Sequence, residues 1–285
     1  MRAMSPPCDH AGNPLNPGET YSLCISKVRN RELKARLQAA TPLVEQAAAD
    51  YDAQASGAML YRLSTHNGIG ALTTLEMVNV YTNGMVPVKI PGRSVYDRII
   101  NAAPLGICPL CDLGSVTTLD HHLPKSDYPG LAVTPNNLIP SCMRCQGAKH
   151  RSVPRTAEEQ TLHPYFDNFE SRPWLIAEIQ RTAPASFTFR VDSLAQWDAI
   201  TIERLRHHLT VFKIPALYAS NAAQELNNIR KRLTDLFSVG GRDEVQSHLM
   251  EEAASRRAAR LNSWQAAMYS AASRDGWFCQ DGFAR

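Results

Sequence analysis

The stretch that decides the expected fold is residues 108–149, CPLCDLGSVTTLDHHLPKSDYPGLAVTPNNLIPSCMRCQGAK. It begins with the pair Cys108 and Cys111 and closes with the pair Cys142 and Cys145, each spaced Cys-x-x-Cys. Two such pairs supply four thiolates, which is the tetrahedral sulfur set of a structural zinc site. We therefore predict a closed Zn²⁺ site that joins two distant segments. Four unrelated core cysteines are the alternative, and the paired spacing disfavours them.

The composition of the whole chain limits the class of protein. The chain has 285 residues, of which 44% are hydrophobic and 20% are charged, as in ordinary folded domains. No apolar run approaches the roughly 18 residues that a membrane-spanning helix needs, and the first residues lack the apolar segment of a signal peptide. Seven cysteines, an odd count, argue against a secreted disulfide framework. We expect a cytoplasmic protein with no membrane partner.

Composition and turn signals divide the chain into three regions. Residues 1–103 form a partly helical N-terminal accessory region, residues 104–155 hold the cysteine pairs, and residues 156–285 begin with two strands and continue as helices. The net charge of +3 neither requires nor excludes a nucleic-acid partner. The cysteine region is mildly basic, with five Lys and Arg against three Asp and Glu. That excess is weak support for a nucleic-acid surface, and a mixed solvated surface is the plainer interpretation.

Periodicity predicts several elements outside the cysteine region. Residues up to about 25 are expected to form an irregular lead, and the residues from about 28 to 52 favour helix. The apolar stretch 71–80 suits either a helix or a strand. Two strands are predicted at 174–179 and 187–191, and helices follow, of which one is expected over 243–273.

Between the cysteine pairs lie side chains that suit a second metal ion. They are Asp120, His121, His122, Asn136 and Asn137. Carboxylate, imidazole and amide groups beside a zinc clamp can build an oxygen-rich site, and such a site suits Mg²⁺ or Mn²⁺. Plainer interpretations exist: either histidine could lie in the core or beside the zinc, and the asparagines could be turn residues after Pro135.

The order Cys-x-x-Cys, Asp-His-x-x-Pro, Asn-Leu and Cys-x-x-Cys-x-x-x-Lys resembles the HNH endonuclease family, the zinc-clamped branch of the ββα-metal nucleases. The resemblance covers residues 108–149. It implies an α+β fold in which a small ββα-metal nuclease module, treble-clef-like with a Cys₄ zinc, occupies 104–155. Mainly helical N- and C-terminal regions with a short β-hairpin would flank it. The less specific string HPYFD at 163–167 resembles the segment downstream of the nuclease in some bacterial HNH proteins, which are often encoded near phage-defence or mobile-element genes.

The family pattern implies a role for each motif residue. Beyond the four zinc cysteines, Asp120 would be a ligand of the catalytic divalent metal, His121 the general base, and Asn137 the residue that orients the base. The family usually has Asn or His after the last zinc cysteine as a second metal ligand, whereas this chain has Gln146. Its amide oxygen can bind a hard cation, and His150, one helical turn further, could share the same face and replace it.

The resemblance implies metal-dependent hydrolysis of nucleic-acid phosphodiester bonds, with DNA as the expected substrate and 5′ phosphate and 3′ hydroxyl ends as products. A neutral imidazole can take the proton of the attacking water, and the metal can polarise the phosphoryl group. Four basic side chains are expected to neutralise backbone phosphates: Lys125, Arg144, Lys149 and Arg151. An antiviral role with a partner protein from the same operon fits such a nuclease. A homodimer that cuts both strands fits as well.

Two other functions stay open on the sequence alone. Gln146 at the second ligand position is compatible with a zinc-dependent module that binds DNA or protein without cleaving it. An RNase that acts in host defence or as a toxin would use the same residues on a different substrate.

Overall fold

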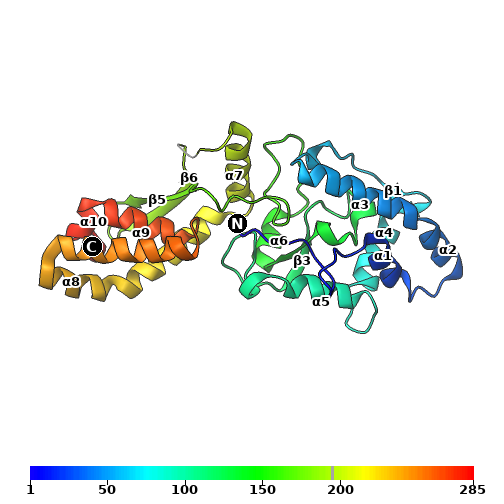
Figure 1. The fold of residues 1–285 in the computed structure, drawn as a ribbon, viewed down its shortest axis with the longest axis horizontal. Helices are drawn as coiled ribbons and strands as arrows, with labels where there is room; N and C mark the ends of the chain where they lie inside the picture. The colour runs from blue at the N-terminus through cyan, green and yellow to red at the C-terminus, as the bar shows by residue number, and fades with distance from the viewer. Residues whose placement is uncertain (194–195) are drawn as a thin grey trace. The chain divides into compact units, whose positions relative to one another are not determined.

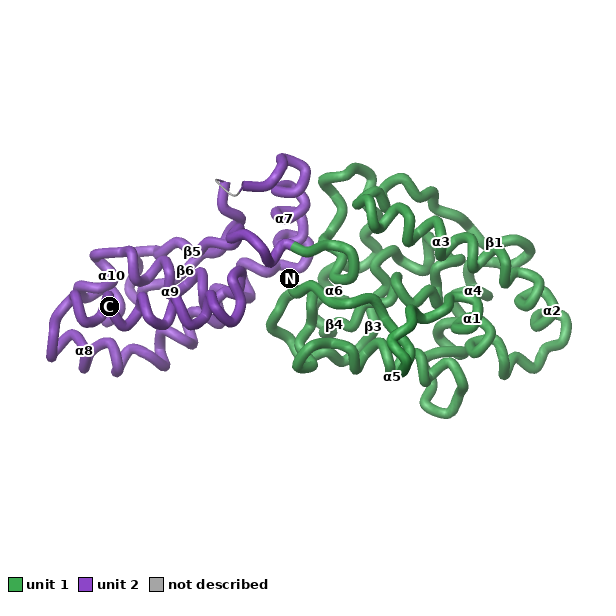
Figure 2. The backbone as a smooth tube through the Cα atoms, viewed as in Figure 1, with its two compact units in different colours: residues 1–168 green, residues 169–285 purple. Residues whose placement is uncertain are grey.

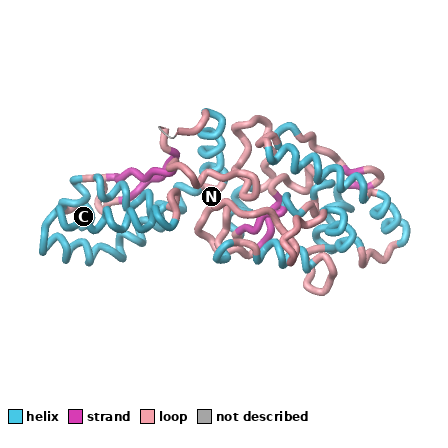
Figure 3. Tube along the Cα trace, in the orientation of Figure 1, coloured by secondary structure: helices cyan, strands magenta, loops and turns pink. Residues whose placement is uncertain are grey.

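The computed structural model describes residues 1–193 and 196–285. They form two compact units, Met1–Asn168 and Phe169–Arg285 (Figure 2). Each unit combines helices with short antiparallel strand pairs (Figure 3). Unit 1 contains both the N-terminal region, residues 1–103, and the cysteine region, residues 104–155. No helix of the described residues has the length and apolar character to span a bilayer.

Unit 1 contains helices gathered around a small hairpin (Figure 1). Its helices are α1 (Pro17–Ile25), α2 (Arg31–Ala39), α3 (Thr41–Ser56), α4 (Thr74–Gly84), α5 (Arg93–Asn101) and α6 (Met143–Lys149). Its strands are β1 (Gly68–Ile69), β2 (Leu72–Thr73), β3 (Thr118–His121) and β4 (Leu138–Ser141). Four short 3₁₀ turns complete it: η1 (Leu60–Arg62), η2 (Pro104–Gly106), η3 (Pro129–Leu131) and η4 (Pro135–Asn137).

Capping residues explain where the N-terminal helices begin. The expected irregular lead up to residue 25 is wrong for α1, because the Asn16 side chain accepts a hydrogen bond from the Glu19 N–H and Pro17 occupies the first turn. The residues from 28 to 52, which were expected to favour helix, form two helices, α2 and α3. Pro42 lies in the first turn of α3, where proline is tolerated, and it cannot continue α2.

The stretch 71–80, which suited either a helix or a strand, forms β2 and most of α4. Thr73 and Glu76 make a reciprocal capping box at the start of α4. Arg36 of α2 reinforces it, because its Nη2 donates to Glu76 Oε1 at 2.5 Å. Local capping therefore decides this segment in favour of helix.

The N-terminal helices and the β3–β4 hairpin share one hydrophobic core. Leu119 of β3 and Leu138 of β4 are buried in the same cluster as side chains from α1, α3, α4 and α5. Those helical members include Tyr21, Val44, Met77 and Ile99. A two-stranded hairpin is at best marginally stable alone. The accessory region therefore supplies the core that residues 104–155 lack, which explains why unit 1 contains both.

The hairpin register sets the positions of the motif residues. β3 and β4 are antiparallel, with Asp120 opposite Ile139 and His121 opposite Leu138. His121 is thus the last residue of β3, and helix α6 begins two residues after β4 ends. The order β3, β4, α6 is the ββα order that the sequence motif led us to expect.

Unit 2 packs one hairpin against helices. Its strands are β5 (Leu175–Gln180) and β6 (Ser186–Val191), close to the two predicted strands. Its helices are α7 (Ala199–Val211), α8 (Ile214–Ala259), α9 (Trp264–Arg274) and α10 (Gly276–Gln280), followed by the turn η5 (Gly282–Ala284). Phe187, Phe189 and Val191 alternate along β6 on its buried face.

The C-terminal helices differ from the predicted helix over 243–273. α8 is broken at Gly241, whose φ of +66° favours glycine, and it ends before Arg260, which is extended. Ser263 then caps α9 by accepting a hydrogen bond from the Ala266 N–H. The prediction of one helix over 243–273 is wrong because the residues between α8 and α9 have a helix-like composition but form a turn.

Asn262 holds the segment that enters β5. Its Oδ1 accepts from the N–H groups of Trp174 and Leu175, and its Nδ2 donates to the carbonyls of Phe169 and Arg172. A buried backbone group left without a partner costs about 1–3 kcal/mol. We expect Asn262→Ala to lower the free energy of unfolding of unit 2 by about 3 kcal/mol.

Urea unfolding followed by tryptophan fluorescence measures that loss, because all four tryptophans of the chain lie in unit 2. Asn228→Ala, at an exposed position of α8, is the matched control and should change the midpoint little. An equal midpoint for both variants would show that Asn262 is not structural.

Candidate active site

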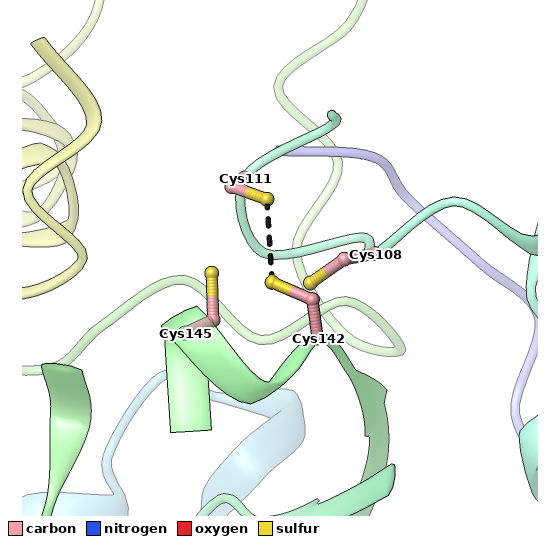
Figure 4. Close-up of side chains that lie close together, drawn as sticks. All are labelled: Cys108, Cys111, Cys142 and Cys145. Carbon is pink, nitrogen blue, oxygen red and sulfur yellow. Dashed lines mark hydrogen bonds between the residues drawn. The ribbon is translucent and has the colours of Figure 1, made fainter. Parts of the chain in front are cut away.

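The four cysteines converge as a zinc site requires. Their Sγ atoms all lie within 4.8 Å of one another and all four residues are buried. Figure 4 shows the side chains turned toward a common centre, with the sulfur atoms of Cys111 and Cys142 separated by 3.9 Å. Hydrogen bonds from neighbouring thiols, first that of Cys108, lower the pKa of Cys111, and they lower the pKa of Cys142 to about 7. Four buried sulfurs that converge on one centre suit Zn²⁺.

A tight turn presents the first cysteine pair. The Cys108 N–H donates to the Gly114 carbonyl at 2.8 Å, and the Gly114 N–H donates to Cys111 Sγ at 3.4 Å. Any Cβ at position 114 would lie 2.9 Å from Cys142 Sγ, so the close approach requires glycine. The second pair sits where β4 meets α6, because Cys142 is the N-cap residue of that helix.

His121 is held at the end of β3 by a backbone acceptor. Its Nε2 lies 2.8 Å from the Ala132 carbonyl oxygen, which can only accept, so Nε2 carries the proton. Nδ1 then holds the lone pair of the neutral ring, and it has no hydrogen-bond partner among the described residues. The Tyr81 ring packs against the imidazole edge to face, with centroids 4.5 Å apart. Only 5% of the residue is exposed, and burial lowers the pKa of His121 to about 3.

Asn137 acts on the loop that follows His121 and makes no contact with the imidazole that the structure records. Its Oδ1 accepts from the Leu123 N–H at 2.7 Å, and its Nδ2 donates to the carbonyls of Leu123 and Leu131. These bonds join the start and the end of the loop. They lie next to Ala132, whose carbonyl accepts the hydrogen bond from His121 Nε2. Any orienting effect of Asn137 on His121 is therefore transmitted through the backbone.

Asp120 lies beside two lysines. Lys149 Nζ is 3.2 Å from Asp120 Oδ2 and donates to the His121 carbonyl at 2.5 Å, and Lys149 is only 5% exposed. Lys125 lies over the Tyr81 ring at 5.1 Å from its centroid and interacts with Asp120 through charge. Burial raises the pKa of Asp120, and the Lys149 charge opposes that rise. A divalent ion at Asp120 would have to displace or share this ammonium.

The two residues considered as second metal ligands differ in placement. Gln146 of α6 faces the hairpin, because its Nε2 donates to the Leu119 carbonyl at 3.2 Å. His150 is exposed and lies just beyond α6 with a φ of +49°. The His150 N–H still donates to the Gln146 carbonyl at 3.3 Å, so the two residues are one helical turn apart and only the backbone conformation at His150 departs from the helix. Gln146 is the residue that the fold brings next to β3.

The four basic residues expected to contact phosphate are in different environments. Arg151 makes a bidentate pair with Asp127, at 2.6 and 2.5 Å, and Lys149 is buried on Asp120. Lys125 is partly buried against Tyr81, and Arg144 is exposed on α6. Two of the four are thus already engaged with carboxylates, which reduces the charge available to a phosphate.

Several residues that sequence reasoning missed support the hairpin. Tyr81 comes from the N-terminal region, and Ala132 contributes only a carbonyl, so neither carries a local motif. The HPYFD string does pack here: the His163 ring lies 4.2 Å from that of His122, and the Tyr165 hydroxyl donates to the Leu138 carbonyl at 2.8 Å. The sequence of this string resembles a family segment, but nothing in it predicts that the string packs on the hairpin.

Comparisons with known proteins give partial matches. The chain is 30% identical to protein ea31 of Escherichia phage lambda over 165 residues, which are 56% of this chain and 55% of ea31. It is 45% identical to Septu protein PtuB of Bacillus thuringiensis over 60 residues, which are 21% of this chain and 23% of PtuB. No protein-family model matches the chain, and no solved structure matches it. The matched regions therefore span about half of one relative and a quarter of the other.

Proposed function

We propose that this protein is a metal-dependent endonuclease of the HNH type that hydrolyses phosphodiester bonds in nucleic acid, DNA first of all. The observation that carries the proposal is a buried Cys₄ cluster beside a hairpin whose first strand, β3, ends in Asp120 and His121. The order of β3, β4 and α6 around that cluster supports a treble-clef-like module. The partial match to a Septu protein agrees with this assignment.

His121 is proposed as the general base. At neutral pH its ring is uncharged, because burial holds its pKa far below 7. The bond from Nε2 to the Ala132 carbonyl leaves Nδ1 as the atom that receives the proton of the attacking water. Tyr81 limits rotation of the ring by packing on its edge. The supporting loop, joined by Asn137, thereby sets both the tautomer and the direction of the base.

Asp120 is proposed to hold the catalytic divalent ion, with Gln146 as the nearer candidate for a second ligand and His150 as the more distant one. When bound there, Mg²⁺ or Mn²⁺ would polarise the phosphoryl group and stabilise the leaving oxygen. Lys125 and Arg144 are the proposed phosphate contacts, joined by Lys149 and Arg151 if the substrate draws them from their carboxylate partners.

Lys149→Met is expected to raise the affinity for Mn²⁺ by about tenfold, because it removes a buried ammonium 3.2 Å from Asp120 Oδ2. Titration of the zinc-loaded protein, with free Mn²⁺ followed by electron paramagnetic resonance, measures this change. Lys125→Met removes a more distant charge and is the matched control, and Asp120→Asn should abolish binding in both backgrounds. Unchanged or weaker Mn²⁺ binding in Lys149→Met would contradict the proposed ligand.

We further propose that the nuclease acts in the conflict between bacteria and phages. The partial match to a Septu protein supports a defensive role, in line with the phage-defence association that the HNH resemblance implies. The longer partial match is to a protein of phage lambda. One match is thus to a protein of a phage, and the other is to a protein of a bacterium.

A zinc-dependent binding module is the second candidate function. Two observations favour it: the Asp120 carboxylate is paired with Lys149, and a pKa near 3 makes His121 a weak proton acceptor. A module of this kind would keep the zinc-supported hairpin and bind DNA or protein without cutting. An RNase used in defence or as a toxin differs from the main proposal only in its substrate.

A nuclease assay separates these functions. Zinc-loaded protein is incubated with supercoiled plasmid and with RNA of similar length, in Mg²⁺, in Mn²⁺ and without either ion. The proposal requires divalent-dependent nicking or cutting of plasmid that His121→Ala loses. Equal behaviour of wild type and His121→Ala, both with zinc bound, would favour the binding module, and preferential RNA cleavage would reassign the substrate.

A further inference from the structure

Unit 2 contains a groove that the proposed nuclease does not use. It has a volume of about 510 Å³ and lies between strand β5 and helix α9. Its walls include the successive residues Leu175–Ile179. Successive residues of a strand point to opposite faces, so a groove that touches all five follows the edge of the strand. The groove therefore runs along the side of β5 that faces away from β6.

The backbone of that edge is unpaired within the described chain. β5 pairs with β6 alone, and the bond from the Asp192 N–H to the Trp174 carbonyl sets which residues face β6. Because the direction alternates along a strand, Leu175, Ala177 and Ile179 direct their N–H and C=O groups away from β6. Leu175 agrees, since its N–H donates to Asn262 Oδ1. The peptide groups of Ala177 and Ile179 are thus available to another strand.

The opposite wall leaves room for side chains. Ala267 and Ala271 lie one turn apart on α9 and line the groove with small apolar surfaces. Ala177 and Ile179 share the inward face of β5 with buried Leu175 and are themselves partly exposed. An added strand would place alternate apolar side chains over the two alanines, which is how strand-addition grooves select their peptides.

The charges around the groove favour an acidic ligand. Three carboxylates line the groove: Glu178 is paired with Arg190 at 2.5 Å, Asp275 is paired with Arg181 at 3.2 Å, and Asp192 interacts with Arg190 through charge. Arg274 is exposed at the groove and has no acidic partner among the described residues. Arg257 donates to the Ser270 hydroxyl at 3.0 Å and likewise has no acidic partner in the described chain. Two arginines are therefore left to meet carboxylates from a ligand.

We propose that this groove binds an extended, acidic segment of a partner protein, which adds a strand to the open edge of β5. Main-chain hydrogen bonds from Ala177 and Ile179 give affinity, the alanine-lined wall accepts alternate apolar side chains, and the two arginines select acidic sequences. The inference is independent of the nuclease proposal, because every groove residue lies in unit 2 and the hairpin of Asp120 and His121 lies in unit 1.

Fluorescence anisotropy with the full zinc-loaded chain tests the proposal. The probes are two labelled heptapeptides, one alternating glutamate with valine and one alternating lysine with valine. We expect the acidic peptide to bind at least about tenfold more tightly than the basic one. Ala177→Pro removes an outward N–H without touching the β6 ladder, since proline is tolerated on an edge, and should weaken acidic binding by about tenfold.

Arg274→Glu is the second variant, because its exposed position cannot disturb folding, and it should reverse the preference between the two peptides. Equal affinity for both peptides, or no binding of either, would overturn the proposal. A second copy of this chain could also occupy the edge of β5, and sedimentation equilibrium tests this. A wild-type dimer that becomes monomeric in Ala177→Pro would assign the edge to that second copy and would overturn the proposed partner segment.

Discussion

Zinc-free protein is expected to melt at a lower temperature in residues 1–168, while the stability of residues 169–285 stays unchanged. Of the four cysteines that converge in unit 1, the first pair lies before β3, Cys142 lies between β4 and α6, and Cys145 lies in α6. An ion held by them would join the elements around Asp120 and His121. Structural zinc contributes about 10–16 kcal/mol in small zinc-finger peptides, which is as large as the whole stability of a typical domain. Unit 1 also has its helical core, so we expect Cys145→Ser to lower its melting temperature by about 10–20 °C.

The placement of the tryptophans makes this prediction easy to read. All four lie in unit 2, so their fluorescence should not change when zinc is removed. Melting of unit 1 is followed instead by thermal circular dichroism and by zinc content, which should fall from one ion per chain to none. Cys24→Ser, at a buried cysteine outside the quartet, is the matched control and should keep its zinc. A zinc-free Cys145→Ser protein that melts with the wild type would refute a structural role for the cluster.

His121→Ala is expected to reduce plasmid cleavage by about 10²–10⁴-fold, the range that general base catalysis contributes. The loss follows from removing the Nδ1 lone pair that the bond to Ala132 leaves available. The measurement is the initial rate of nicking per folded molecule, with zinc content and melting temperature determined for each variant.

His122→Ala is the matched control for this second prediction. It removes a neighbouring imidazole of equal burial, and that ring packs on His163. We expect it to lower stability but to change the rate per folded molecule by less than about tenfold. If both variants lose activity equally, the effect is structural and His121 has no special part in the reaction.

The convergence of the four cysteines was predictable from the sequence because its signal is local. Two Cys-x-x-Cys pairs specify their own turns, and a metal that needs four sulfurs leaves one way to combine them. The strands β5 and β6 were predictable for a similar reason, since their alternation has a period of two. In both cases the residues that carry the pattern also make the contacts.

Features that depend on tertiary contacts could not be predicted in this way. The acceptor of His121 is the carbonyl of Ala132, and a backbone carbonyl has no residue type to recognise. Tyr81 reaches the imidazole from a helix that the sequence analysis assigned to an accessory region. The pairing of Lys149 with Asp120 was missed because lysines near a nuclease motif suggest phosphate contacts, whereas burial favours the nearest carboxylate. The role of Asn262 could not be predicted because its side chain acts through four hydrogen bonds to the backbone of a segment distant in sequence.

The long span between the two cysteine pairs has a consequence for how this chain can change over evolutionary time. Residues 112–141 form a loop whose two ends are tied to the same cluster of thiols. Lengthening such a loop carries a small entropic penalty, about 0.6 kcal/mol for each doubling. The sulfur anchors therefore hold the two ends of this span together whatever its length, whereas insertions at the buried turn η3 would displace the Ala132 carbonyl that holds His121.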